Sequence, residues 1–294
     1  AERLGVGERQ LRRLFREHLG ASPVSVAQTR RVLLAKQLIH ETRMPMTEIA
    51  LAAGYRSVRR FNEGFHALYG RPPSALRRDA GRDPSFESSS DGGVSLRLRY
   101  RPPYDWRRIL AHFEARAVDG VEKVEGERYM RTVVHDGQVG TVAVEHDANR
   151  ASLVVTIAFP SVRALPAIVA RVRRAFDLGA GVGAIGQHLS QDPRMARLVA
   201  KRPGLRVPGA WDSFELGVRA ILGQQVSIEH ARRLGSTLAR ICGAPGPVAR
   251  ALDPSLSVAF PRPSDVAAAD LGALRMPRAR KEALSALAKA ALAE

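Results

Sequence analysis

The sequence predicts a multidomain protein in which an all-α part precedes an antiparallel α+β part and then a second all-α part. Three observations favour this fold class. The length of 294 residues fits two or three domains. The stretch 79–93 is rich in Gly, Ser and Asp and has the character of a linker. Apolar residues follow helical spacing before this linker, alternate after it, and return to helical spacing from about residue 184.

The charge indicates a protein that binds a polyanion. The net charge is +17 and the isoelectric point is about 11.2. Residues 1–83 carry 16 basic and 8 acidic side chains, against 30 and 21 in residues 84–294, so the positive charge is denser in the first part. Nucleic acid is therefore the first expected partner, ahead of an anionic membrane surface.

Composition also excludes several classes of protein. Cys242 is the single cysteine, so neither a disulfide framework nor a cysteine-ligated metal site is expected within this chain. No apolar run approaches the ~18 residues that cross a membrane. No signal peptide is visible, and a reducing cytoplasm is the expected location.

The first part of the chain contains an internal repeat. LRRLFREHLGASP (11–23) and FNEGFHALYGRPP (61–73) align at an offset of 50 residues. A helix from about 24 to 41 is expected to connect the two copies. Its inward face is expected to carry four aliphatic side chains: Val26, Leu33, Leu34 and Leu38.

The second copy has the pattern of a helix-turn-helix. A short helix with Ile49, Ala50 and Ala53 inside is expected to stop at Gly54, because glycine tolerates a positive φ. Ser57 is a suitable N-cap for the next helix. That helix has one apolar face (Val58, Phe61, Phe65, Leu68) and one polar face (Arg59, Asn62, Glu63, His66).

A polar, hydrogen-bonding outer face on the second helix is what readout of the DNA major groove requires. The expected DNA-binding residues of this motif are Arg56, Arg59, Arg60, Asn62 and His66. Those of the earlier copy are Arg9, Arg12, Arg13 and Arg16. The alternative is a pair of helical hairpins with solvated charged faces, but the repeat, the turn glycine and the charge density agree on DNA binding.

EIALAAGYRSVRRFNEGFHALYGRPPSALRR resembles the AraC-type transcription-activator DNA-binding domain, over about residues 1–78. The resemblance implies two helix-turn-helix units joined by a rigid helix, with RNA polymerase as a candidate partner. An 18-residue connector spans about 27 Å, compatible with reading helices roughly 34 Å apart on DNA. The first helix of the first unit is expected upstream of Ala1.

The α+β part is predicted over residues 94–208. In VSLRLRYR (94–101) apolar and polar residues alternate, which indicates a half-buried strand. The elements expected after it are a helix at 104–117, strand-like runs at 121–134, 139–146 and 150–159, and a helix at 161–176. From about 184 the pattern is helical, with breaks at 202–209 and 243–250 and a last helix starting near Pro277. GVGAIG (181–186) does not follow a strand, so no dinucleotide cofactor is expected.

FELGVRAILGQQVSIEHA (214–231) contains an unusual helix end. An apolar helix breaks at Gly223 and continues into Gln224 and Gln225 before a second helix begins. The two amides can satisfy the open carbonyls of the helix end, or they can project toward a ligand. The residues alone favour neither alternative.

PPYDW, FELGVRAILGQQVS and LGALRMPRARKEALSALAKAAL resemble the AlkA-type alkylpurine DNA glycosylases, from about residue 94 to the end. The resemblance implies an AlkA-type N-terminal α+β domain at 94–208 and the first part of an all-α helix-hairpin-helix glycosylase domain at 209–294. The turn would then enter the minor groove and fill the gap left by a flipped-out nucleotide. Gln225 would be the wedge, beside Gln224 and Val226. The better-known family pattern has leucine there, so glutamine exchanges apolar stacking for hydrogen bonding.

The resemblance also implies a carboxylate that stabilises oxocarbenium-like charge on the deoxyribose. That aspartate is expected beyond Glu294, since none of Asp253, Asp265 and Asp270 falls at its position; the catalytic residue is therefore unknown. The helix-hairpin-helix is expected downstream too, so residues 1–294 alone are expected to be inactive. Part of the pocket wall is expected from the 104–113 helix, with Tyr104 and Trp106 equally suited to the core and His112 and Phe113 beside them. No metal and no cofactor is expected.

The combined resemblance is to the Ada–AlkA fusion proteins of the adaptive response to alkylation. It implies transcription regulation and base excision repair by a hydrolase of the DNA-3-methyladenine glycosylase II type, with double-stranded operator and alkylated DNA as partners. Two other interpretations remain open. One is a sequence-specific regulator whose glycosylase-like half senses damage without catalysis, and the other is a nonspecific basic architectural protein.

Overall fold

A computed structural model describes residues 5–79, 93–247 and 252–293. The chain forms two compact units, residues 1–87 and 88–294. The predicted linker, 79–93, lies outside the described residues except at its two ends. The predicted α+β and second all-α parts both lie in the second compact unit, and the division at residue 208 stays a prediction.

The first unit is all-helical, as predicted. Its helices are α1 (Glu8–Leu19), α2 (Pro23–Glu41), α3 (Met46–Ala52), α4 (Val58–Tyr69) and α5 (Pro73–Asp79). The Ser22 hydroxyl accepts a hydrogen bond from the Ser25 amide and caps α2, whose first residue is a proline. Gly20 and Gly70 adopt left-handed φ values and end α1 and α4, which explains why both copies of the repeat carry a glycine there.

The inward face of α2 differs from the prediction. Its buried residues are Val32, Ala35, Leu38 and Ile39. The prediction for Leu33 is wrong, because this side chain is 51% exposed. Residues 32, 35 and 39 recur at three- and four-residue spacing and form one stripe, whereas Leu33 lies about 100° around the helix from Val32.

Two phenylalanines dominate the core side of α4. Phe61 and Phe65 are fully buried and contact each other edge to face, with ring centroids 5.8 Å apart. Val58 and Leu68, which share the same predicted apolar face, are 37% and 50% exposed. Helix α4 therefore contributes to the core of the unit through its two central turns rather than through its ends.

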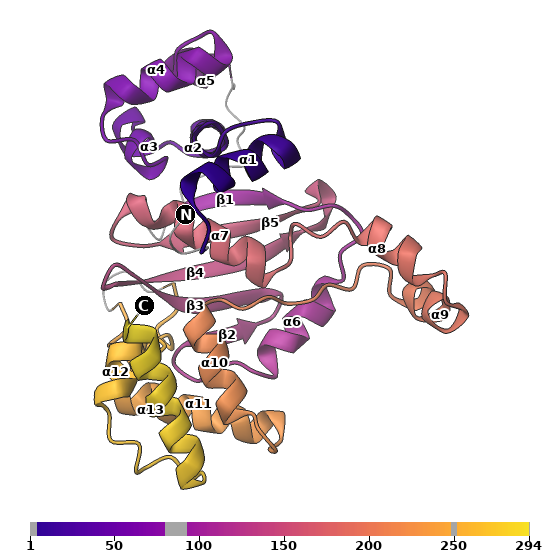
Figure 1. Cartoon of the computed structure of the whole chain (residues 1–294), viewed down its shortest axis with the longest axis vertical. Coiled ribbons are helices and arrows are strands. Elements are labelled where there is room, and N and C mark those ends of the chain that lie inside the picture. Colours follow the sequence, from indigo (N-terminus) through magenta and orange to yellow (C-terminus); the bar gives the residue numbers. More distant parts are fainter. Residues whose placement is uncertain (1–4, 80–92, 248–251, 294) are drawn as a thin grey trace. The chain divides into compact units, whose positions relative to one another are not determined.

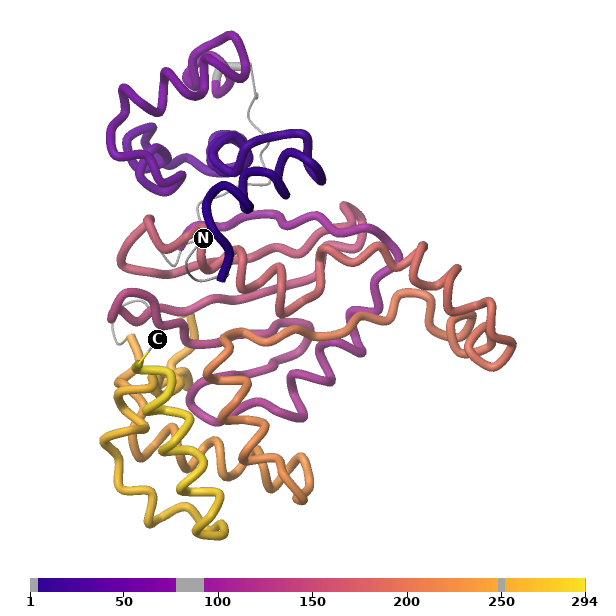
Figure 2. Tube along the Cα trace, in the orientation of Figure 1, coloured from indigo at the N-terminus to yellow at the C-terminus, as the bar shows by residue number. Residues whose placement is uncertain are grey.

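The second unit is built on a five-stranded antiparallel sheet, shown in Figure 1 and as a trace in Figure 2. The strands are β1 (Val94–Arg99), β2 (Glu122–Glu125), β3 (Arg128–His135), β4 (Gln138–Asp147) and β5 (Ser152–Ala158). Their order in the sheet is β1-β5-β4-β3-β2. The predicted run 121–134 is two strands, because Gly126 takes φ +58 and turns the chain between β2 and β3.

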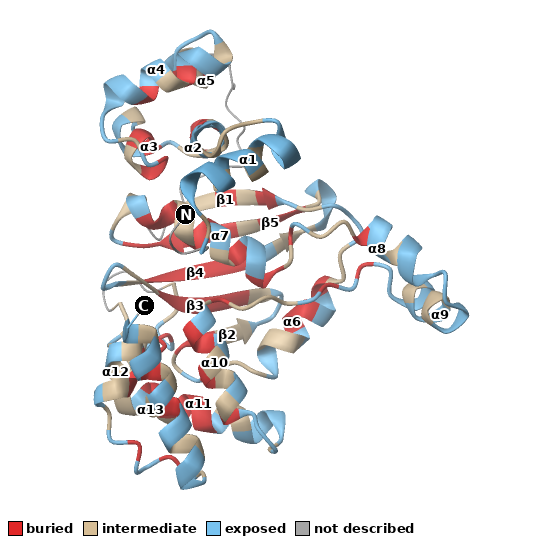
Figure 3. Cartoon of the chain, viewed as in Figure 1, coloured by how far each residue is buried: buried red, intermediate tan, exposed pale blue. Residues whose placement is uncertain are grey.

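Helices cover the sheet and form a second core beside it (Figure 3). They are α6 (Trp106–Glu114), α7 (Leu165–Ala175), α8 (Val182–Leu189), α9 (Pro193–Lys201), α10 (Ser213–Leu222), α11 (Ile228–Cys242), α12 (Pro263–Ala268) and α13 (Arg278–Ala293). Buried residues of the second core come from α10, α11, α12 and α13, among them Val218, Leu238, Val266 and Leu284.

Helices α10 and α13 pack closely in antiparallel directions. A Cβ on Gly217 of α10 would lie 2.9 Å from a methyl carbon of Leu287, so glycine permits the close approach. Gln224, just after α10, is in contact with Arg280 in the first turn of α13.

In the part of the chain that the structure describes, no helix is long and apolar enough to cross a membrane.

Candidate nucleic-acid interface

The α3–α4 segment has the geometry of a helix-turn-helix. Ile49, Ala50 and Ala53 are buried, as predicted. Gly54 takes φ +80 in the turn, and the Tyr55 amide donates to the Ala50 carbonyl at 2.9 Å. The Ser57 hydroxyl accepts from the Arg60 amide and so starts α4 at its N-cap. The turn chemistry predicted for this motif is confirmed.

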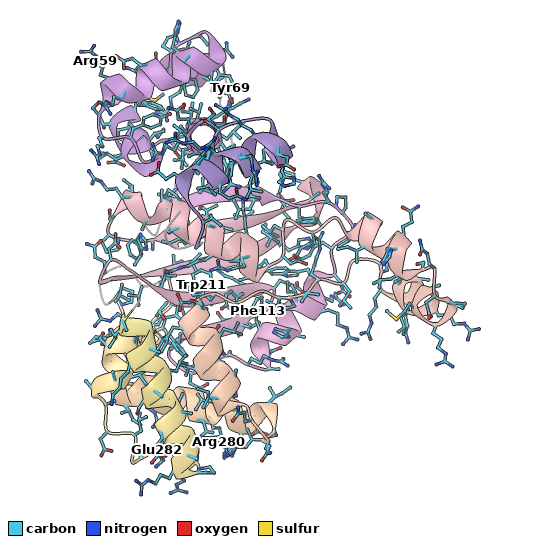
Figure 4. All side chains as sticks on the ribbon, in the orientation of Figure 1. Arg59, Tyr69, Phe113, Trp211, Arg280 and Glu282 are labelled. Atoms are coloured by element: carbon cyan, nitrogen blue, oxygen red, sulfur yellow. The ribbon has the colours of Figure 1, made fainter. Side chains whose placement is uncertain are left out.

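The outer face of α4 is open to solvent. The predicted contact residues of this motif, Arg56, Arg59, Arg60, Asn62 and His66, are all exposed. Arg59 Nε donates to Glu63 Oε1 at 2.8 Å, one helical turn away, and this hydrogen bond raises the pKa of Arg59. Figure 4 shows Arg59 projecting from the helix. The exposure required of a groove-reading face is present, and its DNA contacts stay a prediction.

The four arginines predicted on α1 are exposed as well. Arg9, Arg12, Arg13 and Arg16 recur at three- and four-residue spacing, so they share one face of the helix. Arg12 forms an exposed ion pair with Glu8 at 3.2 Å. The face therefore presents a row of positive charge suited to the phosphate backbone.

In the second unit, the turn between α10 and α11 presents the two glutamines. Gly223 ends α10, with its amide donating to the Arg219 carbonyl at 2.9 Å. Gln225 takes φ +54, in the left-handed region that costs energy for a residue with a side chain. The Ser227 hydroxyl accepts from the His230 amide at 3.1 Å and starts α11.

Both glutamine side chains are exposed. Within the described residues, neither amide side chain forms a hydrogen bond, so they do not cap the end of α10. Instead, Arg280 Nη1 donates to the Gln224 carbonyl at 2.9 Å. Of the two alternatives that the sequence leaves open, helix capping by these side chains is not what the structure shows, and projection toward a ligand stays a prediction.

A buried ion cluster ties α10 to the sheet. Arg131 of β3 donates to Glu215 Oε2 at 2.8 Å, and Arg219 donates to Glu215 Oε1 at 2.9 Å. Arg219 also binds Glu122 of β2, whose other carboxylate oxygen accepts from the Tyr129 hydroxyl at 2.7 Å. Arg219 and Glu215 lie on the helix that leads into the glutamine turn, so the cluster fixes where that turn begins.

The cluster keeps its groups charged despite burial. Burial raises the pKa of Glu122, but the charges of Arg219 and Arg131 lower it by more than burial raises it. The net result is a pKa of about 2. Burial lowers the pKa of Arg219, and the charges of Glu122 and Glu215 outweigh this and raise it above its ordinary value. Two carboxylates and two guanidiniums therefore balance each other inside the unit.

A cavity of about 370 Å³ lies beside this cluster. His112 and Phe113 of α6 line it, as predicted, together with Tyr129 and Trp211. Phe113 and Trp211 are labelled in Figure 4. The Arg131 guanidinium stacks over the Trp211 ring, 4.4 Å from its centroid. Burial lowers the pKa of His112, and the charges of Arg116 and Arg219 lower it further.

Tyr104 and Trp106 do not line this cavity. Trp106 is buried against Phe176, with stacked rings 5.8 Å apart, and the Tyr104 hydroxyl donates to the Phe176 carbonyl at 2.7 Å. Trp106 belongs to the core, which is the second of the two roles that the sequence leaves open for these residues. The half-buried Tyr104 lies beside it, with ring centroids 6.4 Å apart.

The three aspartates considered in the sequence each have a local structural contact. Asp253 accepts from Lys123 Nζ at 2.9 Å, and this contact and the Ser255 hydroxyl lower its pKa to about 2, the hydroxyl contributing most. Asp265 pairs with Arg262 at the start of α12, and Asp270 accepts from the Gly272 amide at 2.8 Å. Among the described residues, no group of three or more His, Cys, Asp or Glu side chains could hold a metal ion.

Comparison with known proteins follows the same two-part division. Residues 1–79 match the family described as "Helix-turn-helix domain", and residues 95–212 match the family described as "AlkA N-terminal domain". The chain is 34% identical over 287 residues to the "Probable bifunctional transcriptional activator/DNA repair enzyme AlkA" of Mycobacterium tuberculosis. That match covers 98% of this chain and 57% of the mycobacterial protein.

Two further relatives match the second unit. "DNA-3-methyladenine glycosylase 2" of Escherichia coli is 39% identical over 198 residues, with 66% of each chain covered. The solved structure of the 3-methyladenine DNA glycosylase from Archaeoglobus fulgidus has a TM-score of 0.57 at 20% identity and 66% coverage of each chain, a likeness of fold.

Together the fold and these matches define an AraC-type helix-turn-helix domain joined to a DNA glycosylase region of the AlkA type. The chain belongs to the AlkA-type proteins in which these two domains are joined. It spans just over half the length of the mycobacterial relative.

Several residues of the candidate site are not found by sequence reasoning. Arg280 reaches Gln224 across 56 positions in the chain, and periodicity gives no sign of such a contact. The ion cluster leaves a partial signal, because Glu215 and Arg219 have the i, i+4 spacing of a helical ion pair. Arg131 lies in the middle of a strand that also carries Met130, Val133 and Val134, which is the pattern of a buried, paired charge.

Proposed function

We propose that the protein regulates transcription and repairs alkylated DNA, reading operator DNA through its first unit and probing damaged DNA through its second. The observation that carries the repair function is the exposed Gln224–Gln225 turn, held at the end of a helix that is anchored in the sheet. Double-stranded DNA is the shared partner of both units, and the bacterial nucleoid is the proposed location. RNA polymerase is the proposed partner of the first unit in activation.

The first unit supports operator binding by geometry and charge. The polar face of α4 is exposed while Phe61 and Phe65 anchor the helix from behind, so the helix can enter a major groove without losing its core. Asn62 and Arg59 are the proposed base-reading residues, because amide and guanidinium groups form paired hydrogen bonds with base edges. Arg9, Arg12, Arg13 and Arg16 are the proposed contacts of α1 with DNA.

The second unit supports damage recognition through the turn. An extruded nucleotide leaves its partner base without hydrogen bonds, and an inserted amide can donate to and accept from that base. Gln225 is the proposed wedge, with Gln224 beside it. The aromatic cavity wall at Phe113, Tyr129 and Trp211 suits a flat base, although Tyr129 itself is fully buried.

The proposed reaction is hydrolysis of the N-glycosidic bond of alkylated purines. It requires a carboxylate beside the departing base. Glu122 and Glu215 line the cavity, but both are held in ion pairs with buried arginines, and we assign the catalytic role to neither. A damage sensor without catalysis is the second candidate, favoured by this pairing of the carboxylates that line the cavity.

Binding measurements with two DNA probes test the division of roles. The chain is titrated with an operator duplex and with a duplex that carries an abasic-site analogue, each against a scrambled, intact duplex. Arg59→Ala is expected to reduce operator preference by about tenfold and to leave abasic-site preference unchanged. Gln225→Ala is expected to reduce abasic-site preference and to leave operator preference unchanged.

Three outcomes contradict parts of the proposal. If both variants change both preferences, the two-unit division of function is wrong. If scrambling the operator leaves affinity unchanged, the first unit is a nonspecific architectural module. If the whole protein releases no methylated purine from alkylated DNA while preferring abasic-site duplexes, the second unit is a sensor rather than part of an enzyme.

A further inference from the structure

We propose that Arg280 is a positioning residue for the glutamine turn: it holds the wedge in its inserting conformation through the Gln224 carbonyl and does not itself enter the DNA base stack. This inference rests on the proposed function of the turn. It assigns to the first turn of α13 a part in lesion recognition that acts through Gln225.

The turn needs an external restraint. Gln225 takes φ +54, and a left-handed conformation is unfavourable for a residue other than glycine. The Gln225 side chain forms no hydrogen bond in the described part of the chain that could offset this cost. The strain therefore persists only if the surrounding structure fixes the neighbouring peptide groups.

Arg280 supplies that restraint next to the strained residue. Its Nη1 donates to the Gln224 carbonyl at 2.9 Å, and this carbonyl belongs to the peptide unit that joins Gln224 to Gln225. Rotation of that peptide group toward an ordinary φ for Gln225 would turn the carbonyl away from the guanidinium. A charge-assisted hydrogen bond is stronger than a neutral one, so the bond opposes the rotation.

The restraint is rigid because α13 is itself held. The close approach of Gly217 and Leu287 fixes α13 against α10. Lys281, the next residue, donates from Nζ to the Gly272 carbonyl at 3.0 Å and anchors the start of the helix to the preceding loop. Arg280 is half-buried in this position, unlike the neighbouring arginine, Arg278, whose side chain is 92% exposed.

Arg278 offers a matched control. Both arginines lie in the first turn of α13 (Figure 4 labels Arg280), and both contribute one positive charge near the same turn. Arg278 pairs with Glu282 on its own helix at 2.7 Å and has no contact with the glutamine turn among those that the structure describes. Comparing the two separates a positioning effect from a simple loss of charge.

The experiment measures abasic-site preference in Arg280→Ala, Arg278→Ala and Gln225→Ala. The probe is a short duplex that carries a tetrahydrofuran abasic analogue opposite 2-aminopurine, with the intact duplex as reference. Both arginine variants are expected to weaken binding to either duplex by a similar factor, through the lost charge. Of the two arginine variants, only Arg280→Ala is expected to lower the preference for the abasic duplex. The expected decrease is about fivefold, the effect of one hydrogen bond.

The fluorescence of 2-aminopurine gives a readout that a general loss of stability does not change. An inserted wedge alters the stacking of this base, so the fluorescence change on saturation is expected to persist in Arg278→Ala and to decrease in Arg280→Ala. In the Gln225→Ala background, Arg280→Ala is expected to have no further effect on the preference, because it acts through the wedge.

The outcomes distinguish this inference from the proposed function. If Gln225→Ala leaves the abasic-site preference unchanged, the wedge itself is refuted. If Gln225→Ala lowers the preference while Arg280→Ala behaves like Arg278→Ala, the wedge stands and the role of Arg280 is refuted. Full additivity of the two substitutions also overturns the positioning role, because it shows that Arg280 acts independently of Gln225.

Discussion

The outer face of α4 and the turn after α10 are both exposed and polar, but they are supported in different ways. Behind α4 lie Phe61 and Phe65, and the helix needs only apolar packing to present its polar side chains. Behind the glutamine turn lies an ion cluster that reaches from β2 and β3 to α10. All the buried polar and charged residues found in the described part of the chain lie in the second unit.

This difference follows from what each surface is proposed to do. A helix that enters a major groove carries its contacts on a regular backbone whose hydrogen bonds are all internal. A turn that enters an opened duplex lacks this internal support, and its position depends on the elements that hold its two ends. The ion cluster holds the helix before the turn, and Arg280 holds the turn itself.

The largest expected effect comes from breaking the ion cluster. Glu122→Ala leaves the buried Arg131 without one of its two carboxylates, and it also removes a partner of the partly exposed Arg219. Removing one partner of a buried pair such as Glu122–Arg131 costs about 3–5 kcal/mol of unfolding free energy. We expect the thermal transition of the second unit to fall strongly and that of the first unit to stay unchanged, as measured by calorimetry. The control is Glu282→Ala, which breaks an exposed pair with Arg278 and should cost no more than about 0.5 kcal/mol.

The same carboxylate gives the second unit a defined sensitivity to acid. The pKa of Glu122 is about 2 in the folded chain against an ordinary value of 4.5, so its ionised form stabilises the folded state above pH 4.5. This stabilisation is lost as the pH falls from 4.5 toward 2. Acid unfolding in this window should therefore be less steep in Glu122→Gln than in the unmodified chain, and an equal steepness would contradict the role of Glu122.

The helix-turn-helix is largely predictable from the sequence because its signals are local. Gly54, Ser57 and the spacing of Phe61 and Phe65 each act within a few residues, and the structure confirms all of them. Leu33 is mispredicted because an apolar residue on a helix can lie at the edge of the buried stripe, and only the packing partners determine where the stripe falls.

The support of the glutamine turn is not predictable in the same way. Glu122, Arg131 and Arg219 come from three elements, and their contact depends on how sheet and helix pack, which no short sequence window contains. The exposure of Gln225 is equally a result of packing. The sequence marks the turn as unusual, and the structure shows its side chains exposed, while their role as a wedge stays a prediction.

An intermediate effect is expected from Asn62→Ala on the polar face of α4. Because Asn62 is exposed and α4 is anchored by Phe61 and Phe65, removal of this amide should leave the stability of the first unit unchanged. Operator affinity should fall by about tenfold, since a paired amide–adenine contact contributes roughly 1–3 kcal/mol of discrimination. Gel-shift titration with operator and scrambled duplexes measures both effects, and Asn149→Ala, at an exposed amide of the second unit, is the matched control.

The smallest effects are expected from the two serine caps, and they compare the units directly. Ser57 accepts from the Arg60 amide at 3.3 Å, and Ser227 accepts from the His230 amide at 3.1 Å. Each Ser→Ala change should cost about 1 kcal/mol of unfolding free energy. The same free energy shifts the midpoint of thermal unfolding more in a small domain than in a large one. The expected shift is about 4–8 °C for a domain the size of residues 1–87 and about 2–4 °C for one the size of residues 88–294.

Calorimetry on the intact chain resolves the two caps if the units unfold separately. Ser57→Ala should move only the transition of residues 1–87, and Ser227→Ala only that of residues 88–294. A single transition that moves in both variants would show that the two units unfold together. Helix α4 and the glutamine turn would then be two parts of one cooperative structure, although they are supported differently. In that case the loss of Glu122 should destabilise α4 as well as α10.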